Sequence, residues 1–237
     1  MSFNAEATIA RTIQSVMNQT YDDIEYIVID GASRDNTAQV ARSFIEKFNR
    51  SPNRTMTVIS EPDKGMYDAL NKGARLAHGV IIGQINADDW YEPDAVESMA
   101  GLYEREHYDL AWGSLNVITG SGKFIKHAKR GLFWSTSHWC HPAAFASREV
   151  LLQNPYPLEN SHDDFDFATN LFVNQKKLIQ VDKVISNFTF GGMSTQKNFG
   201  EVKKRINEIY GIHRKYGMSR LYYFYRLAFE TVKYFLT

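Results

Sequence analysis

A run of apolar residues that ends in two adjacent carboxylates constrains the fold of this chain more than any other feature. Residues 80–86 read VIIGQIN, and Asp88 and Asp89 follow one residue later. Strands that are buried in parallel sheets are nearly continuous apolar runs, and ligands bind beyond their carboxyl ends. Mg²⁺ and similar hard cations prefer carboxylate oxygens and leave positions open for phosphates. The run therefore predicts an α/β fold and a metal-dependent enzyme that acts on a phosphorylated ligand.

A second apolar run, earlier in the chain, ends in the same way. Residues 25–29 read EYIVI, and Asp30 follows directly. Ser33 and Asp35 come next, and both are residue types that favour the start of a helix. If the two strands are parallel neighbours, Asp30 and the Asp88–Asp89 pair face one cleft.

Strands and helices alternate over the first half of the chain, which predicts a doubly wound, mostly parallel sheet. After Asp109 the pattern changes to a hairpin, a helix that opens near Asp163 and two terminal helices. A mixed C-terminal half with a helical tail is therefore expected. The expected helices cover residues 5–18, 37–48, 66–77, 94–106, 201–216 and 221–235, and the expected strands cover 25–30, 56–59, 80–86, 110–118 and 124–127.

Charge and cysteine content exclude several classes of protein. The 237 residues include 27 Lys and Arg against 27 Asp and Glu, so the chain lacks the basic excess of most nucleic-acid-binding proteins. The single cysteine, Cys140, excludes an intrachain disulfide and fits a reducing compartment. The sequence shows neither a signal peptide nor an apolar stretch of about 18 residues. We expect a cytoplasmic protein, with peripheral contact at the inner face of the membrane left open.

Five segments occur in an order that resembles a known family. They are residues 2–6 (SFNAE), 15–21 (SVMNQTY), 29–37 (IDGASRDNT), 61–73 (EPDKGMYDALNKG) and 86–89 (NADD). The order is similar to that of family 2 glycosyltransferases, which are inverting enzymes with the GT-A fold. The resemblance implies a nucleotide-sugar donor, with UDP favoured, and Mg²⁺ or Mn²⁺ as cofactor. It also suggests an acceptor in a bacterial surface polysaccharide or a lipid-linked oligosaccharide.

The same resemblance divides the chain. Residues 1–200 would form the GT-A domain, with a donor-binding half up to about residue 108 and an acceptor-binding half after it. Residues 201–237 would form a helical extension. Members of the family usually begin with an apolar strand just before the segment at Phe3, whereas only Met1 and Ser2 stand there in this sequence. We therefore expect the first, central strand to be missing.

The donor-side roles follow from the resemblance. Asp89 would bind the metal that bridges the donor diphosphate, because the leaving diphosphate gathers negative charge that a cation stabilises. Asp88 would contact the ribose or the outer shell of the metal. Asp30 would accept a hydrogen bond from a uracil N–H, and Phe3 would stack on the base. The residues that would line the rest of the donor pocket are Glu6 and Lys64.

Each donor-side role has a structural alternative. Asp88 and Asp89 could cap the next helix, although Glu92 or Asp94 could do so equally well. Asp30 could be an ordinary turn aspartate. Phe3 could be a core side chain at the entry of a helix, and Lys64 could be a solvated lysine in a loop.

The general base is expected in the segment 161–166, which reads SHDDFD. An inverting transfer needs a carboxylate that accepts the proton of the acceptor hydroxyl as its oxygen attacks the anomeric carbon. Asp164 fits the family pattern best, because an aromatic and then an acidic residue follow it, and Asp163 is the second candidate. The alternative is helix capping, which would account for one of these acids.

Three further residues are assigned near the acceptor or to a closing loop. His141 stands before a proline in a segment that the family uses near the acceptor or metal, and a structural histidine is the alternative. Trp90 would stack on a sugar face, although tryptophans are more often simply buried. Ser194 belongs to the segment GGMST at residues 191–195, which resembles a loop that closes over the donor phosphates.

Two interpretations of the aromatic tail and three rival functions stay open. The helix at 221–235 could rest on an anionic membrane, or it could pack on the domain or in a homodimer. The rival functions are a sugar-nucleotide pyrophosphorylase, a glycoside hydrolase and a degenerate, non-catalytic nucleotide- or sugar-binding subunit. A pyrophosphorylase would carry a Gly-rich, Arg-bearing signature near its N-terminus, which this chain lacks. A hydrolase would leave Asp30, Asp88 and Asp89 unexplained.

Overall fold

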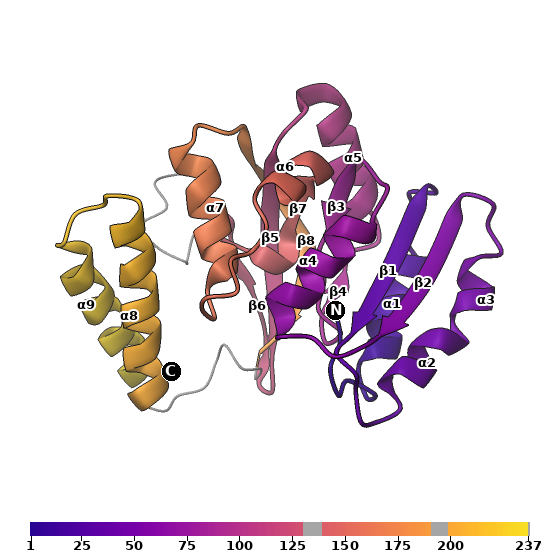
Figure 1. Ribbon diagram of the computed structural model, residues 1–237, viewed down its shortest axis with the longest axis horizontal. Helices are drawn as coiled ribbons and strands as arrows, with labels where there is room; N and C mark the ends of the chain where they lie inside the picture. Colours follow the sequence, from indigo (N-terminus) through magenta and orange to yellow (C-terminus); the bar gives the residue numbers. More distant parts are fainter. Residues whose placement is uncertain (130–138, 191–198, 237) are drawn as a thin grey trace.

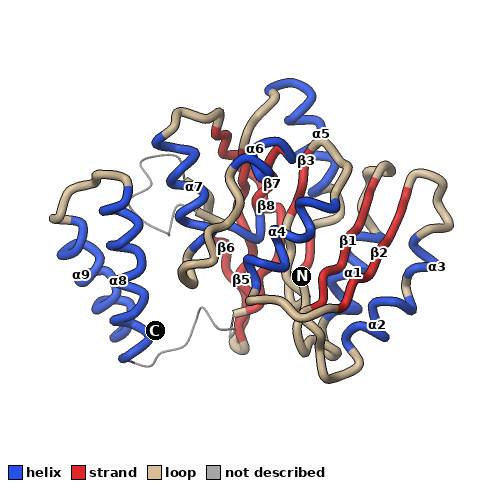
Figure 2. The backbone as a smooth tube through the Cα atoms, in the orientation of Figure 1, coloured by secondary structure: helices blue, strands red, loops and turns tan. Residues whose placement is uncertain are grey.

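Two groups of strands and a separate pair of helices make up the chain. The structure is a computed structural model that describes residues 1–129, 139–190 and 199–236. Figure 1 shows the two-stranded sheet at one side, the larger sheet in the middle and the terminal helices α8 and α9 at the other side. The two groups of strands are also separate in Figure 2. Buried apolar side chains of both sheets and of helices from α1 to α8 form one core cluster.

The first sheet pairs two parallel strands, β1 (Ile24–Asp30) and β2 (Arg54–Ser60). Asp30 lies opposite Ser60 at the end of the ladder. The helices of this half are α1 (Ile9–Met17), α2 (Thr37–Ser43), α3 (Ile45–Phe48) and α4 (Met66–Leu76).

The helix expected over residues 37–48 is divided at Phe44. The Phe44 N–H donates to the carbonyl of Ala41, three residues earlier, at 3.2 Å. The helix therefore tightens for one turn at this point and then resumes as α3. Ala41 and Phe48 are buried on both sides of this break. The sequence therefore predicted the helical range but not the local tightening within it.

The larger sheet is mixed, with strand order β3-β7-β5-β8-β4 and β6 paired to β5. Only β5 and β8 run parallel in it, and the other pairs are antiparallel. The two strands of the first sheet are parallel, as the alternation in the first half predicts, whereas β3 and β4 pair antiparallel with β7 and β8, which belong to the mixed C-terminal half. The strands are β3 (Ile81–Gly83), β4 (Trp90–Tyr91), β5 (Leu110–Thr119), β6 (Gly122–Lys126), β7 (Ala144–Ser147) and β8 (Leu178–Thr189).

The strand expected over residues 80–86 keeps only three residues in the ladder. Gly83 lies so close to β7 that a Cβ there would be 2.5 Å from Phe145 Cε1. Beyond Gly83 the chain leaves the sheet, and residues 84–89 run free of it toward the two carboxylates. This departure frees the segment to carry functional side chains.

Helices and one short 3₁₀ turn complete the second half. They are α5 (Ala95–Glu106), the turn η1 (His141–Ala143), α6 (Arg148–Gln153) and α7 (Asp163–Val173). Figure 1 shows α6 and α7 near the same side of the larger sheet as α4. The helix α4 packs against both β1 and α6, so it joins the two halves.

Met1 and Ser2 connect β1 to the segment after β3. Ser2 forms a single parallel bridge with Asp30, in which the Ser2 N–H donates to Ile29 O at 2.8 Å. The α-amino group of Met1 donates to the carbonyl of Ile85 at 3.0 Å. No strand precedes β1 within the described residues.

The tail consists of α8 (Phe199–Lys215) and α9 (Tyr222–Leu236), close to the two terminal helices that the sequence predicts. The buried carboxylate of Asp166 on α7 accepts from Lys215 Nζ at 2.6 Å and from Tyr216 Oη at 2.6 Å. Among the helices of the described residues, none has the length and apolar character that crossing a membrane requires. The side chains of α8 that pack inward are Val202, Ile206, Ile209 and Ile212.

Candidate active site

Asp30 sits at the carboxyl end of β1 and is wholly buried. Its carboxylate accepts from Ser33 Oγ at 2.5 Å, Ser60 Oγ at 2.6 Å, the Ser33 N–H at 3.0 Å and Ser2 Oγ at 3.1 Å. Burial alone would raise the pKa of Asp30, but the hydrogen bonds from Ser33, Ser60 and Ser2 bring it below its usual value. Asp30 is therefore an ionised, rigidly held acceptor. A nucleobase N–H could reach it only if one of these hydroxyls turned away.

Asp89 is also wholly buried, at the far end of the free segment. Its Oδ1 accepts from the Thr189 N–H at 3.0 Å, and its Oδ2 accepts from Asn86 Nδ2 at 3.1 Å. Burial and the neighbouring charge of Asp88 raise the pKa of Asp89 to about 7. The helix-capping alternative does not fit, because α5 begins only at Ala95 and neither oxygen of Asp89 bonds to it.

The Asp88–Asp89 pair fits a Mg²⁺ or Mn²⁺ ion. Two hard carboxylates are the donor type that these cations prefer, and such ions commonly take one or two carboxylates, with phosphates and waters for the rest. No group of three or more His, Cys, Asp or Glu that could hold a metal is found in the part of the chain that the structure describes. A cation here would also offset the like charges and the burial that raise the pKa of Asp89.

The two aspartate-bearing ends do not meet through neighbouring strands. β1 pairs only with β2 among the described strands, and β3 lies in the other sheet, so the condition for a shared cleft between parallel neighbours is not met. The charges of Asp88, Asp30, Asp89 and Asp63 nonetheless all favour the charged form of the α-amino group of Met1, although burial lowers the pKa of this amine to about 6. A common site for Asp30 and the Asp88–Asp89 pair stays a prediction.

The other predicted donor-side residues differ in what they touch. Phe3 is 60 % exposed, so the alternative of a core phenylalanine is wrong. Glu6 accepts from the Asn36 N–H at 3.1 Å and from Asn36 Nδ2 at 3.0 Å, which fastens it to the start of α2. Lys64 is exposed and lies just before α4. All three side chains are exposed, so a ligand could reach each of them.

Trp90 is half-buried, and one face of its ring is occupied. The guanidinium carbon of Arg11 lies 3.9 Å from the ring centroid, a cation–π contact. Arg11 also donates to the Asp88 carbonyl at 2.7 Å, so the stacked pair braces the segment that carries the two carboxylates. Stacking on a sugar stays a prediction for the other face of Trp90.

Asp164 lies in the first turn of α7 and is held by two neutral donors. Tyr67 Oη donates to its Oδ1 at 2.7 Å, and Trp139 Nε1 donates to its Oδ2 at 2.9 Å. Burial would raise the pKa of Asp164, but His141, Tyr67, His162 and Trp139 together lower it below its usual value. The carboxylate is therefore ionised at neutral pH and oriented from two sides, as a general base has to be.

Asp163 faces the other way. It is wholly buried, and its oxygens accept from the N–H groups of Glu159 at 3.0 Å and Asn160 at 3.1 Å. Burial raises the pKa of Asp163. These contacts close the turn before α7, so the structural alternative fits Asp163, whereas the side chain of Asp164 is held by Tyr67 and Trp139.

His141 belongs to a buried polar cluster beside Asp164. Its Nε2 lies 3.2 Å from Gln84 Oε1 and 3.4 Å from Tyr156 Oη, and Tyr156 Oη donates to Gln84 Oε1 at 2.5 Å. Burial lowers the pKa of His141, although Asp164 opposes this. Gln84 precedes Asp88 by four residues, which an extended chain spans in at most about 14 Å. The base cluster and the carboxylate pair are thus connected by one short segment.

Several residues of this cluster escaped sequence analysis. Tyr67 lies within the segment 61–73, but nothing in a single sequence shows that its hydroxyl reaches Asp164. Gln84, Trp139 and Tyr156 are separated too widely in the sequence to suggest a cluster. Ser194 and its loop lie outside the described residues.

Comparison with known proteins gives one family. Residues 1–178 match the family model described as glycosyl transferase family 2. The chain is 31 % identical over 215 residues to a PGL/p-HBAD biosynthesis glycosyltransferase of Mycobacterium bovis, covering 86 % of this chain and 81 % of the relative. It is also 36 % identical over 96 residues to the chondroitin synthase of Escherichia coli, which covers 40 % of this chain and 13 % of that protein.

Solved structures share the fold at low identity. The S. aureus TarS 1–349 structure in complex with UDP-GlcNAc aligns with a TM-score of 0.69 at 18 % identity over 91 % of this chain. The mannosyltransferase PcManGT from Pyrobaculum calidifontis, in complex with GDP-Man and Mn²⁺, aligns with a TM-score of 0.69 at 18 % identity over 90 % of this chain. This chain spans 63 % and 61 % of those two chains, less than two thirds of either. The predicted GT-A fold is confirmed.

Proposed function

This chain belongs to glycosyl transferase family 2, and we propose that it moves a sugar, with inversion, from a nucleotide-diphosphate donor to an acceptor hydroxyl. The observation that carries the proposal is the ionised carboxylate of Asp164, which Tyr67 and Trp139 hold in place. The segment after β3 carries Gln84, which contacts His141 of the cluster beside Asp164, and then the half-buried Asp88 and the buried Asp89. A base on α7 and an anion-stabilising pair on this segment suit a single-displacement transfer.

The proposed reaction is a direct displacement at the anomeric carbon. Asp164 accepts the proton of the acceptor hydroxyl while the hydroxyl oxygen forms the new bond to the anomeric carbon. The bond from that carbon to the diphosphate oxygen breaks, and its electron pair leaves with the nucleoside diphosphate. Tyr67 and Trp139 keep the carboxylate oriented during the proton transfer. Attack from the face opposite the leaving group inverts the configuration.

A divalent cation held by Asp89, with Asp88 near it, would neutralise charge on the departing diphosphate. Asp30 and Phe3 are proposed to bind the base and Glu6 and Lys64 to line the donor pocket. A UDP-sugar is the proposed donor, since a carboxylate such as Asp30 accepts well from a uracil N–H. Neighbours of the same fold carry UDP-GlcNAc in one case and GDP-Man with Mn²⁺ in another.

The degenerate-subunit alternative is not favoured. A subunit that had lost catalysis would have no need for an ionised Asp164 with two aligned donors, and the pKa of that carboxyl is lowered in spite of its burial. The degenerate-subunit alternative would gain support only if nucleotide binding occurred without any turnover.

His141 and Trp90 are proposed to lie near the acceptor.

Nucleotide binding tests the proposal without knowledge of the acceptor. Purified protein is heated with UDP, GDP, CDP or dTDP, each with Mn²⁺ and with EDTA. One nucleotide should raise the unfolding temperature only when Mn²⁺ is present, because a ligand that binds only the folded state stabilises it by mass action. If none of the four nucleotides changes the unfolding temperature of well-folded protein, the proposed donor site is wrong.

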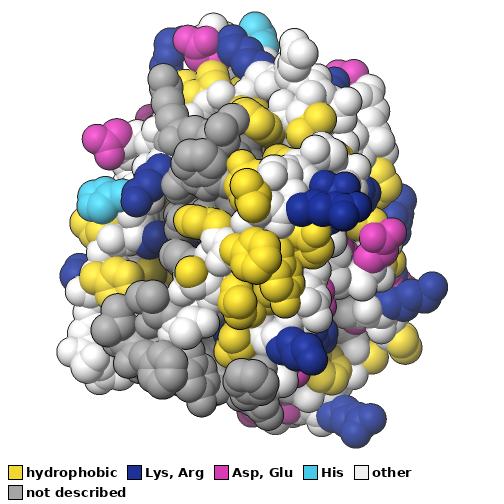
Figure 3. All heavy atoms as spheres, turned by 90° about the vertical axis from the view of Figure 1, so that its left-hand side faces the viewer, with side chains coloured by type: hydrophobic (Ala, Val, Ile, Leu, Met, Phe, Trp, Pro, Cys, Tyr) yellow, Lys and Arg dark blue, Asp and Glu magenta, His cyan; other side chains and the backbone are white. Residues whose placement is uncertain are grey.

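The acceptor is proposed to be a saccharide or lipid-linked oligosaccharide met at the inner face of the membrane. The supporting observation is an exposed apolar patch on and beside α9, here called the α9 patch. Figure 3 shows apolar side chains gathered on this side of the molecule, with Lys and Arg around them. Its members, with exposed fractions, are Leu221 72 %, Phe224 66 %, Tyr225 45 % and Leu227 41 %.

Charge favours an anionic membrane over a second copy of the chain as occupant of the α9 patch. Residues 199–237 contain eight Lys and Arg against three Asp and Glu, although the whole chain has no net charge. Two copies of so basic a tail would repel each other, whereas anionic headgroups attract it. A cytoplasmic enzyme that rests on the inner leaflet through this patch is the arrangement that we propose.

The double substitution Leu221→Asp with Phe224→Asp should weaken binding to vesicles that contain phosphatidylglycerol by about tenfold or more, since two apolar side chains lose their burial. Sedimentation with anionic and neutral vesicles measures this, and Glu104→Ala, at an exposed position of α5, is the control. If the double variant binds these vesicles as strongly as wild type, the proposed contact of the α9 patch with the membrane is wrong. A concentration-dependent dimer that the same substitutions disrupt would favour the homodimer instead.

A further inference from the structure

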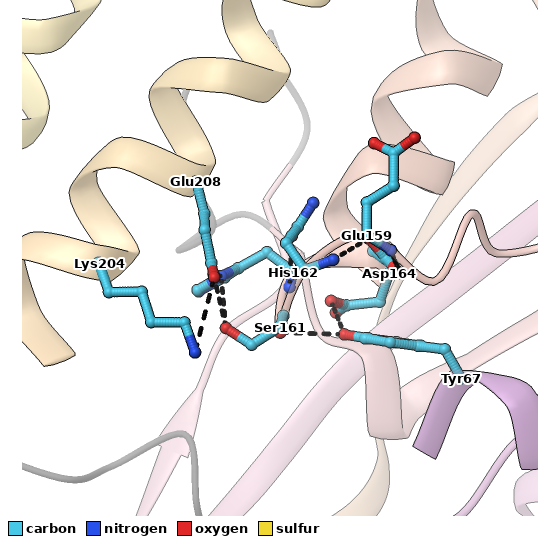
Figure 4. A network of polar contacts seen from close by, with 9 residues as sticks. Tyr67, Glu159, Ser161, His162, Asp164, Lys204 and Glu208 are labelled. Atoms are coloured by element: carbon cyan, nitrogen blue, oxygen red, sulfur yellow. Dashed lines mark hydrogen bonds and ion pairs between the residues drawn. The ribbon is translucent and has the colours of Figure 1, made fainter. Parts of the chain in front are cut away.

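The helical tail reaches the turn that carries Asp164. Glu208 on α8 directs its carboxylate into the gap before α7, where Oε2 accepts from Ser161 Oγ at 2.6 Å and lies 2.9 Å from His162 Nδ1 (Figure 4). The Glu208 side chain is only 13 % exposed, and that of His162 only 17 %. Glu208 lies 46 residues from His162 and beyond residues 1–178, which match the family model.

Ser161 connects this contact to the base. Its hydroxyl bonds to Glu208, while its carbonyl accepts from Tyr67 Oη at 3.1 Å. The single hydrogen of this Tyr67 hydroxyl is shared with Asp164 Oδ1, which is the nearer acceptor at 2.7 Å. Displacement of Ser161 would therefore disturb the hydroxyl that orients the base.

His162 supplies a second connection. It immediately precedes Asp163 and Asp164, and its charged form favours ionised Asp164. Glu208 fixes the ring through Nδ1, and the pKa of Glu208 itself is lowered by Ser161 and His162 against the effect of burial. Lys204 Nζ lies 3.9 Å from the other carboxylate oxygen, Glu208 Oε1, so Oε2 keeps its contacts with Ser161 and His162.

We propose that Glu208 is a positioning residue for catalysis: the tail helix α8 uses its carboxylate to hold Ser161 and His162, and through them Tyr67 and Asp164. The proposal rests on the proposed function of Asp164 as the base. It gives the C-terminal extension a role in the chemistry of the domain, beyond covering α7. Removal of the Glu208 contacts should lower turnover with little effect on the donor site, which lies at the other end of the segment after β3.

A second anchor of α8 provides a matched control. Lys215 Nζ donates to Asp166 Oδ2 at 2.6 Å, two helical turns beyond Glu208, and does not touch the turn before α7. Lys215→Met therefore weakens the docking of α8 on α7, while Tyr216 Oη still bonds to Asp166. Any effect that comes only from looser docking should appear equally in Lys215→Met and in the Glu208 variants.

The test combines turnover with a signal that needs no activity. The indole N–H of Trp139 bonds to Asp164, so its resonance in a ¹H–¹⁵N spectrum reports the position of that carboxylate. Trp139→Phe assigns the resonance, and Asp164→Asn shows the change when the carboxylate is lost. Glu208→Ala should move the resonance and lower kcat about tenfold to 100-fold, since a misplacement near 1 Å can cost that much. Glu208→Gln, which keeps one acceptor oxygen for Ser161, should lie between Ala and wild type.

The donor KM and the Mn²⁺-dependent nucleotide shift should stay at wild-type values in all Glu208 variants. The inference is overturned if Glu208→Gln and Glu208→Ala leave both the Trp139 resonance and kcat unchanged, or if Lys215→Met changes them equally. A wild-type chain without any transfer would instead contradict the proposed function. In that event the Trp139 resonance alone would still decide whether Glu208 positions Asp164.

Discussion

Asp164→Asn should lower the rate of transfer by about 10²–10⁴-fold while nucleotide affinity stays close to wild type. The amide keeps the shape of the side chain and one acceptor oxygen for Tyr67 or Trp139, but it cannot accept the proton of the acceptor hydroxyl. Donor binding depends on the opposite end of the segment after β3, so it should not change. Initial rates with saturating donor, together with the donor dissociation constant, separate the two effects.

Asp163→Asn is the matched neighbour for this experiment. Its oxygens bind the N–H groups of Glu159 and Asn160, so the expected cost is in stability and not in proton transfer. Thermal unfolding of both variants shows whether either rate change comes from misfolding. If Asp163→Asn lost transfer while folded and Asp164→Asn retained it, the assignment of the base would be reversed.

Asp89→Asn should weaken Mn²⁺-dependent nucleotide binding by at least about 100-fold, because substitution even of residues around metal ligands costs 10–100-fold. The neutral amide removes the charge that would hold the cation, and Asp88 alone is a poor site. Titration calorimetry of the nucleotide with Mn²⁺ and with EDTA measures the loss. In EDTA the variant and the wild type should bind alike.

Stability in EDTA supplies the control for the Asp89 variant. The pKa of Asp89 is raised to about 7 in the folded chain, so its contribution to stability is full below its unfolded value and is lost as pH rises through about 7. Asp89→Asn should therefore unfold at no lower temperature than wild type at about pH 8. Unchanged Mn²⁺-dependent affinity in a stable variant would remove Asp89 from the metal site.

Most of what the sequence could predict came from the two apolar runs that end in aspartates, at residues 25–30 and 80–89. They placed Asp30 at the end of a strand, as it is in β1, and the Asp88–Asp89 pair beyond an extended run, of which β3 is the part that stays in a sheet. The ordered segments led to family 2 and to a GT-A transferase, and the comparisons confirm the family, the enzyme class and the fold.

Strand pairing was harder to predict than strand identity. The longest strand, β8 at Leu178–Thr189, was missed because Asp182 and Lys183 interrupt its apolar pattern. It lies beside β5 in the sheet interior, where register shifts accommodate the irregular segment. Partners in a sheet are chosen by packing across the whole domain, which a local pattern does not encode.

The different roles of Asp163 and Asp164 could not be predicted from the sequence either. Both sit at the start of a helix, and local sequence allowed either to be a base or a cap. The structure separates them by partners, backbone N–H groups for Asp163 and the side chains of Tyr67 and Trp139 for Asp164. Glu208 could not be found at all from sequence, because only the docking of α8 brings it to His162.

The stereochemistry of the released sugar tests the central claim most directly. The protein is incubated with an α-linked nucleotide-sugar, first UDP-linked, and Mn²⁺, with water or a simple saccharide as acceptor, and the anomeric proton of the first product is followed by NMR. Single displacement with Asp164 as base predicts a β-configured product that appears with free nucleoside diphosphate, absent with EDTA. An α-configured first product would contradict the inverting mechanism.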